Sequence, residues 1–229
     1  MIGNMFFVLL KLESLKTKIF RKPIFLQQAI KAIISLGDKM KTREMILFLG
    51  PMFSGKTTHL FAAIERHQRR QQLVVCFKPK IDDRYSSNEI VTHSGMKIPA
   101  VTVKNGNEIM DAISKMEQQP RVVAVDEAFM IENSHQALLQ LFFKGITVYV
   151  SSIDISANLK TFLEIDKLLP YATHVVKCAA ICECCLDDAQ LTYRKFESDS
   201  EISVGGIEVY EPRCWSCHPL VSKKNWLNV

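Results

Sequence analysis

The alternation of apolar and polar positions predicts strands separated by helices from residue 45 onward. Met45–Leu49 is a continuous apolar run of strand length, bounded by charged residues and a glycine, as in a buried parallel strand. Apolar residues recur at helical spacing within Thr57–Arg70 and again within Asn133–Phe143. Further strands are predicted at Gln72–Phe77, Arg121–Val125, Ile146–Ser151 and Thr173–Lys177. Strands that alternate with helices indicate an α/β fold around a parallel sheet flanked by helices.

A phosphate-binding motif follows the first predicted strand. Residues 50–57 read GPMFSGKT and match the pattern G-x-x-x-x-G-K-[ST]. The two glycines let the backbone turn its N–H groups toward a phosphate, while Lys56 reaches the β- and γ-phosphates and Thr57 offers a hydroxyl group to Mg²⁺. The next helix directs its positive N-terminus at the same anion. The expected fold is therefore a RecA-like P-loop domain, whose predicted ATP-binding residues are Gly50, Ser54, Gly55, Lys56, Thr57 and Thr58.

Two acidic residues end another predicted strand. Residues 122–127 read VVAVDE, so Asp126 and Glu127 follow a buried apolar run. In P-loop enzymes an acid at this place lies beside the phosphate loop and can hold Mg²⁺. We assign Asp126 to the metal side and Glu127 to the base that takes a proton from a hydroxyl nucleophile. The alternative is that both acids only cap the next helix.

Six of the seven cysteines lie between residues 178 and 217. Two C-x-x-C pairs, Cys182 with Cys185 and Cys214 with Cys217, fit a tetrahedral, structural Zn²⁺ site. Two other ligand sets are compatible with the spacing: Cys184 could take the place of Cys185, and His218 could take the place of Cys217. The other two cysteines, Cys76 and Cys178, are interpreted as buried core thiols.

The charge distribution separates the first 43 residues from the rest. The formal net charge is +5, yet residues 1–43 alone carry nine basic and two acidic residues. The remaining body is nearly neutral, which argues against nucleic acid as a partner. No apolar run is long enough to cross a bilayer. The basic segment is either a leader before a later start, such as Met40, or an organelle-targeting helix.

The predicted organisation has four parts. They are a basic N-terminal extension at 1–43, a P-loop domain at 44–177, a zinc-binding domain at 178–222 and a C-terminal tail at 223–229.

Motifs in a fixed order along residues 45–218 resemble the zinc-containing thymidine kinases of the cytosolic and viral type. The phosphate loop and the acidic pair are two of them, and the two cysteine pairs, the first followed by Ala189, Thr192 and Arg194, are two more. Between these lie a D-x-R-Y-S segment and a T-H pair, and a G-G-x-x-x-Y segment, the lasso, precedes the second cysteine pair. The residues that carry these three segments are Asp82, Arg84, Tyr85, Ser86, Thr92, His93, Val204, Gly205, Gly206 and Tyr210.

The resemblance implies transfer of the ATP γ-phosphate to the 5′-hydroxyl group of thymidine. Glu127 would be the general base, and Arg84 would neutralise charge on the phosphoryl group in transfer. The implied substrate-binding residues are Asp82, Phe129, Met130, Gly205, Gly206 and Tyr210. The family also implies ATP, Mg²⁺ and structural Zn²⁺, a homotetramer, no membrane or nucleic-acid partner, and a cytoplasmic location.

The chain departs from the family pattern in the region that lines the nucleoside pocket. Phe129 and Met130 follow the acidic pair where other types are usual, and Ala157 stands where an aromatic residue is common. These departures motivate a kinase for another deoxynucleoside as an alternative. Two further alternatives are a P-loop ATPase whose zinc module binds nucleic acid and a protein that holds ATP without turnover. Residues 178–222 lack a basic stripe with interleaved aromatic residues, which disfavours the nucleic-acid-binding ATPase. Asp126 and Glu127 are both present, which disfavours a protein without turnover.

Overall fold

The structure is a computed structural model that describes residues 44–81, 88–92, 95–196 and 205–223. The described residues belong to one compact unit, Arg43–Val229. The expectations for residues 1–43 and for residues 224–229 lie outside the described residues.

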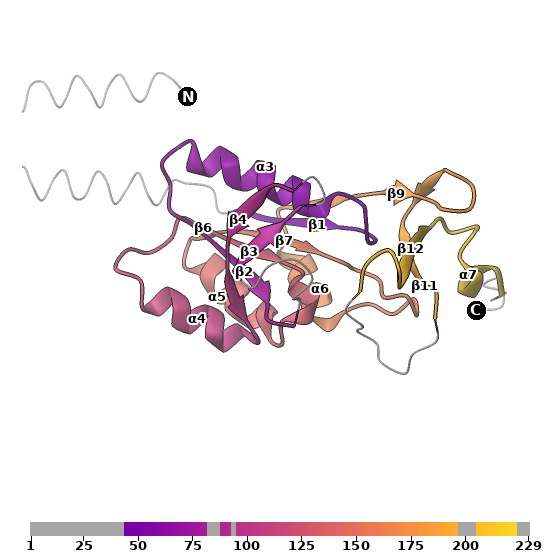
Figure 1. Ribbon diagram of the computed structural model, residues 1–229. Helices are drawn as coiled ribbons and strands as arrows, with labels where there is room; N and C mark the ends of the chain where they lie inside the picture. The colour runs from indigo at the N-terminus through magenta and orange to yellow at the C-terminus, as the bar shows by residue number, and fades with distance from the viewer. Residues whose placement is uncertain (1–43, 82–87, 93–94, 197–204, 224–229) are drawn as a thin grey trace, which may run out of the picture. The chain divides into compact units, whose positions relative to one another are not determined.

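A six-stranded parallel sheet forms the centre, in the order β5-β2-β6-β7-β1-β8 (Figure 1). Its strands are β1 (Met45–Leu49), β2 (Val74–Pro79), β5 (Val101–Val103), β6 (Val122–Asp126), β7 (Thr147–Ser152) and β8 (His174–Lys177). The apolar runs of β1, β6 and β7 are almost completely buried because helices cover both faces of the sheet. The α/β P-loop fold expected from the sequence is confirmed.

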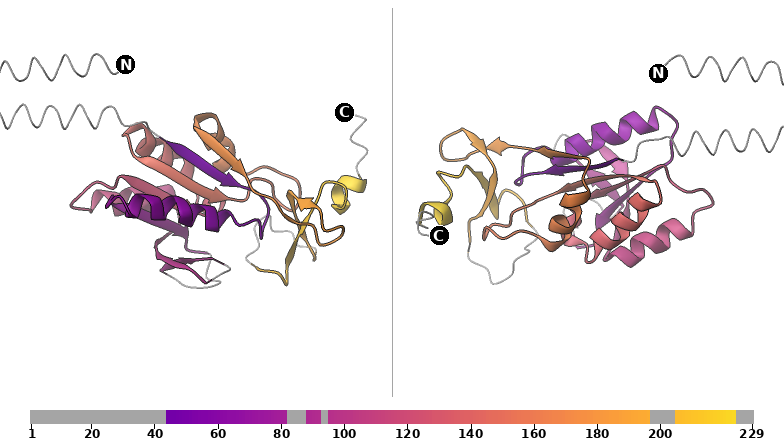
Figure 2. Two further views of the ribbon diagram at one scale, coloured as in Figure 1. Left: turned by 90° about the horizontal axis from the view of Figure 1, so that it is seen from above. Right: turned by 180° about the vertical axis from the view of Figure 1, so that it is seen from behind.

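The two faces of the sheet are covered by different helices, as Figures 1 and 2 show. Helix α3 (Lys56–Gln68) packs on one face, where Leu60 and Ile64 join Val122 and Ala124 in a buried cluster. On the other face, Val123 and Val125 of the same strand join residues of three helices. These are α4 (Gly106–Ser114), α5 (Ser134–Phe143) and α6 (Leu163–Leu168). Successive residues of β6 therefore serve two cores, as the pleat of a strand requires.

The chain beyond β8 forms small antiparallel pairs at one end of the sheet (Figure 2). They are β9 (Ala180–Ile181) with β10 (Asp188–Ala189), and β11 (Leu191–Arg194) with β12 (Tyr210–Arg213). A short helix, α7 (Pro219–Lys223), follows. A third pair, β3 (Glu89–Val91) with β4 (Lys97–Pro99), lies between β2 and β5 in the chain. Two 3-10 turns, Ala128–Met130 (η1) and Leu169–Tyr171 (η2), are the remaining elements of the part of the chain that the structure describes.

The sequence pattern located most of these elements and missed the shortest ones. The predicted strand Met45–Leu49 matches β1. The strand expected at Gln72–Phe77 instead runs two residues later, because its end pairs with β5 through Phe77–Pro79. Helix α4 and the three-residue strands were not predicted. Within the described ranges, every helix is too short or too polar to cross a membrane.

Candidate active site

The phosphate loop turns sharply between β1 and α3 and is held from behind by the chain that leaves β8. Gly50 has a φ of 157°, and a Cβ atom there would lie 2.2 Å from the carbonyl oxygen of Cys178. The N–H of Cys178 also donates a 2.7 Å hydrogen bond to the carbonyl oxygen of Leu49. Only a residue without a side chain allows this approach. Gly55, at φ 76°, supplies the left-handed residue that precedes α3.

Lys56 lies buried inside the loop, with 6% of its surface exposed. Its Nζ donates a 2.6 Å hydrogen bond to the carbonyl oxygen of Pro51, which also accepts 2.8 Å from the hydroxyl of Ser54. Burial lowers the pKa of the Lys56 ammonium group, and the charges of Glu127 and Asp126 oppose that shift. A bound triphosphate would supply the negative charge that a buried lysine requires.

Asp126 ends β6 beside the start of α3 and is 8% exposed. The Thr57 hydroxyl lies 3.3 and 3.4 Å from its two carboxylate oxygens, and Ser151 on β7 donates a hydrogen bond to one of them. A hydroxyl and a carboxylate that converge in this way are oxygen ligands of the kind that Mg²⁺ prefers. The donor set thus fits a magnesium ion, which Thr57 and Asp126 would hold.

Glu127 follows with backbone angles that a side-chain-bearing residue seldom adopts. Its φ of 50° and ψ of 47° place it in the left-handed region, immediately before the 3-10 turn η1. Strained residues of this kind concentrate at functional sites, where the surrounding structure holds them. The turn directs Glu127 into the same pocket as Lys56 and Thr57.

The pocket at this edge of the sheet collects residues from the phosphate loop, β2, β3, β6 and the lasso. It is lined by Met52, Phe53, Ser54, Gly55, Lys56, Thr57, Thr58, Lys78, Ile90, Val91, Asp126, Glu127 and Gly206. Most of the predicted ATP-binding residues, both acids and one lasso glycine are thereby brought together. Lys78 was not singled out from the sequence. The only signal there is a lysine at the end of a strand, and only the fold shows that it is buried.

Other predicted site residues lie just outside this pocket. Phe129 and Tyr210 are 8% and 6% exposed and share a buried cluster with Met52 and Ala157, against which Met130 packs. The ring of Phe129 packs at a tilt against that of Phe162, with centroids 4.5 Å apart. Gly205 precedes Gly206 at the start of the described part of the lasso. Asp82, Arg84, Tyr85, Ser86, His93 and Val204 lie outside the described residues.

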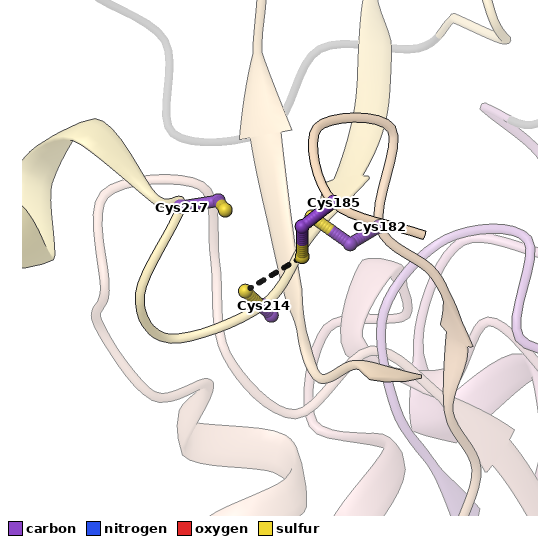
Figure 3. A group of neighbouring side chains, drawn as sticks. All are labelled: Cys182, Cys185, Cys214 and Cys217. Carbon is purple, nitrogen blue, oxygen red and sulfur yellow. Dashed lines mark hydrogen bonds between the residues drawn. The ribbon is translucent and has the colours of Figure 1, made fainter. Parts of the chain in front are cut away.

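The four cysteines of the two C-x-x-C pairs converge where the turn between β9 and β10 meets the chain that follows β12 (Figure 3). Their sulfur atoms all lie within 4.8 Å of one another, and those of Cys185 and Cys214 are 3.7 Å apart. A tetrahedron of thiolates around zinc has sulfur–sulfur edges of about 3.8 Å, from Zn–S bonds of about 2.3 Å. Burial alone would raise the pKa of the Cys182 thiol, but hydrogen bonds from the backbone of Cys214 and Cys185 lower it to about 7. The cluster therefore fits a metal ion of the zinc type.

The two residues considered as substitute ligands have other contacts. The exposed Cys184 accepts a hydrogen bond from the guanidinium group of Arg213. His218 is fully buried; its Nε2 lies 3.3 Å from the carbonyl oxygen of Thr192, and its Nδ1 accepts 3.3 Å from the N–H of Leu220. Neither side chain belongs to the four-sulfur cluster. His218 instead ties the second cysteine pair to β11.

The fold and the pocket define a P-loop nucleotide-binding protein with a four-cysteine cluster that could hold a metal ion. A family model described as thymidine kinase matches residues 43–218. The curated thymidine kinase of Pseudothermotoga lettingae is 31% identical over 184 residues, which cover 80% of this chain and 98% of that protein. This chain belongs to the thymidine kinase family.

Among solved structures, the X-ray structure of the Legionella pneumophila ATPase DotB aligns with a TM-score of 0.34 at 17% identity. The alignment covers 54% of this chain and 34% of that one, so the chain spans about a third of the length of DotB.

Proposed function

We propose that this chain transfers the γ-phosphoryl group of ATP to the 5′-hydroxyl group of thymidine. The observation that carries the proposal is one pocket, in a chain of the thymidine kinase family, that holds a phosphate-loop lysine beside two strand-end acids. Thymidine and ATP are the substrates that the family implies. The product would be thymidine monophosphate, a precursor for DNA synthesis.

The proposed reaction assigns a role to each side chain. Lys56 and the loop N–H groups hold the β- and γ-phosphates, while Thr57 and Asp126 hold Mg²⁺, which when bound neutralises phosphate charge. Glu127 accepts the proton of the 5′-hydroxyl as its oxygen forms a bond to the γ-phosphorus. The bond between that phosphorus and the β-phosphate oxygen breaks, and ADP leaves. Arg84, outside the described residues, would stabilise the charge on the transferring group.

The nucleoside would lie between Glu127 and the lasso. Gly206 lines the pocket on that side, and the N–H of Tyr210 donates 3.0 Å to the carbonyl oxygen of Gly206, so the lasso folds back on itself there. Lys195 closes the base of this turn, since its N–H donates 2.9 Å to the carbonyl oxygen of Val209. Zinc at the four cysteines would stabilise both ends of this segment. Asp82, Phe129, Met130 and Gly205 complete the proposed substrate contacts.

A kinase for another pyrimidine deoxynucleoside is the second candidate, and the aromatic packing favours it. Ala157 is a small residue where an aromatic side chain is usual, and the rings of Phe162 and Phe129 pack against each other at a tilt. A base pocket built from these residues differs in shape from that of the family. A comparison of three nucleosides as phosphate acceptors distinguishes the two candidates.

The test is phosphate transfer from ATP to thymidine, deoxyuridine and deoxycytidine by the purified chain and by Glu127→Gln. We expect transfer to thymidine, and a fall in kcat of about 100-fold or more in the variant, from loss of the base. The exposed Glu132→Gln variant is the matched control and should be unaffected. Transfer to none of the three nucleosides would contradict the proposal, and preference for another of them would establish the second candidate.

A homotetramer and a cytoplasmic location form part of the same proposal, on family likeness alone. Light scattering of the purified chain measures the first. The division into a P-loop domain at 44–177 and a zinc-binding domain at 178–222 also stays a prediction, as does a targeting role for residues 1–43.

A further inference from the structure

Lys78 is a buried lysine at the carboxyl end of β2, on the edge of the sheet where the pocket lies. It is 4% exposed, and its Nζ lies 3.4 Å from the backbone carbonyl oxygen of Glu89. A buried ammonium group loses the hydration that stabilises its charge, so it persists where negative charge is close. The pocket that Lys78 lines also contains the carboxylates of Asp126 and Glu127.

The pairing of β2 with β6 places Lys78 level with Asp126. Phe77 pairs with Val125, so Lys78 is the next residue on β2 as Asp126 is the next residue on β6. Phe77 and Val125 face the cluster under α4 and α5, and the residues before them face the cluster under α3. Because side chains alternate along strands, Lys78 and Asp126 both turn toward the face of α3, which carries the phosphate loop.

Two lysines therefore flank the strand-end acids along this edge of the sheet. Lys56 lies on the side of the phosphate loop, after β1, and Lys78 lies on the opposite side of β6, at the carboxyl end of β2. Asp126 and Glu127 lie between them, and all four residues line the same pocket. A γ-phosphoryl group held by Lys56 and attacked by a hydroxyl beside Glu127 would lie between two positive charges.

We propose that Lys78 is a second catalytic lysine of this site, whose ammonium group binds an oxygen of the γ-phosphoryl group as it passes from ATP to the nucleoside. This inference rests on the proposed function. Lys78 exchanges no proton in the reaction: the hydroxyl proton goes to Glu127, and the electrons of the breaking bond go to ADP. Its contribution is electrostatic and is strongest at the transition state, because the charge on the transferring group is spread over oxygens that it reaches. This stabilisation would add to the stabilisation of the same charge that is expected from Arg84.

A purely structural role for Lys78 predicts a different response to substitution. Methionine has nearly the same length and no charge, so Lys78→Met removes a buried charge without leaving a large cavity. If the lysine serves the reaction, the variant should fold and melt at the same temperature or higher, since the cost of burying a charge is gone. If it serves a buried ion pair of the fold, the variant should be destabilised, because the partner is left alone.

The experiment measures kcat and KM for ATP and thymidine, together with the melting temperature, for the full chain and three variants. Lys78→Met should lose about 100-fold in kcat, the usual effect of removing one transition-state donor, with little change in either KM. Lys78→Arg should recover part of that loss because it keeps the charge. Lys80→Met, at an exposed position two residues later, is the matched control and should behave as the unmodified chain.

The possible outcomes separate this inference from the proposed function. An unmodified chain without thymidine kinase activity contradicts the proposed function. With activity present, a Lys78→Met variant that keeps kcat within about threefold of the Lys80→Met control overturns only the role of Lys78. A Lys78→Met chain that no longer folds also overturns it, since the lysine would then be needed by a structural partner.

Discussion

The backbone N–H of Met52, in the phosphate loop, donates a 3.0 Å hydrogen bond to the hydroxyl group of Thr192, which lies 140 residues later on β11. The carbonyl oxygen of the same Thr192 lies 3.3 Å from Nε2 of His218, the residue after the second cysteine pair. One threonine thus links the phosphate loop to the four-cysteine end of the chain. The connection runs through β11, a single strand of four residues.

Replacing this threonine tests whether the link positions the phosphate loop. Thr192→Val keeps the shape of the side chain but leaves the Met52 N–H without its acceptor in a buried place. We expect a loss of about 1–3 kcal/mol in the free energy of unfolding, the usual cost of an unsatisfied buried group, and a higher KM for ATP. Urea unfolding and ATP titration measure both.

Thr192→Ser is the control because it keeps the hydroxyl group. It should retain the ATP affinity of the unmodified chain more closely than Thr192→Val. Equal ATP affinity in the valine variant would show that the loop is positioned by its own turn and by Cys178 alone.

Removing one cysteine of the four-sulfur cluster tests the metal site. Cys214→Ser should abolish stoichiometric zinc binding, because three thiolates and a hydroxyl hold zinc far more weakly than four thiolates. Loss of the metal should loosen β11 and β12, and through Thr192 and Tyr210 it should weaken binding of both substrates. Zinc content by a colorimetric chelator and nucleotide affinity by titration are the two readouts.

Cys184→Ser is the matched control, since this exposed cysteine lies between two ligands in the sequence but outside the cluster. It should keep one zinc ion per chain. A Cys184→Ser variant that loses zinc, or a Cys214→Ser variant that keeps it, would show that the ligand set is wrong.

The buried Lys56 predicts a pH dependence of ATP binding. Burial lowers its pKa below the ordinary value of 10.5. As the pH rises through that lowered pKa, the empty site loses its charge, so ATP affinity should begin to fall at a lower pH than for a free lysine. Lys56→Arg, which stays charged, should not show this fall at the same pH. An ATP affinity that is constant up to pH 10.5 would contradict the shift.

The lowered pKa of Lys56 also affects the free energy of unfolding, and in the opposite direction: stability rises over the pH range in which ATP affinity falls. Between the lowered pKa and 10.5, the unfolded chain binds a proton at Lys56 that the folded chain does not, so stability rises with pH in that window. Below the lowered pKa both states are charged and the burial cost remains in full. Lys56→Met should therefore raise the melting temperature of the chain without ATP while abolishing turnover.

The sequence alone determined those features of the protein that are encoded within one short stretch of residues. The apolar run Met45–Leu49 can be little other than a buried strand, and the glycines and lysine of the phosphate loop can be read because the spacing itself creates the anion site. The C-x-x-C spacing likewise predicts a metal knuckle from each pair alone. Asn105 was a missed local signal: it caps α4 through a 3.1 Å bond from the N–H of Glu108.

Only the tertiary structure decided the relationships between distant segments. Three-residue strands such as β5 show no periodicity, and they exist because a neighbouring strand offers a free edge. Lys78 is an ordinary lysine in the sequence and becomes a buried cation because β2 pairs with β6 in one register. Thr192 meets Met52 because the chain returns from the sheet past the phosphate loop. Such contacts depend on burial and register across the whole fold, which no single stretch of sequence encodes.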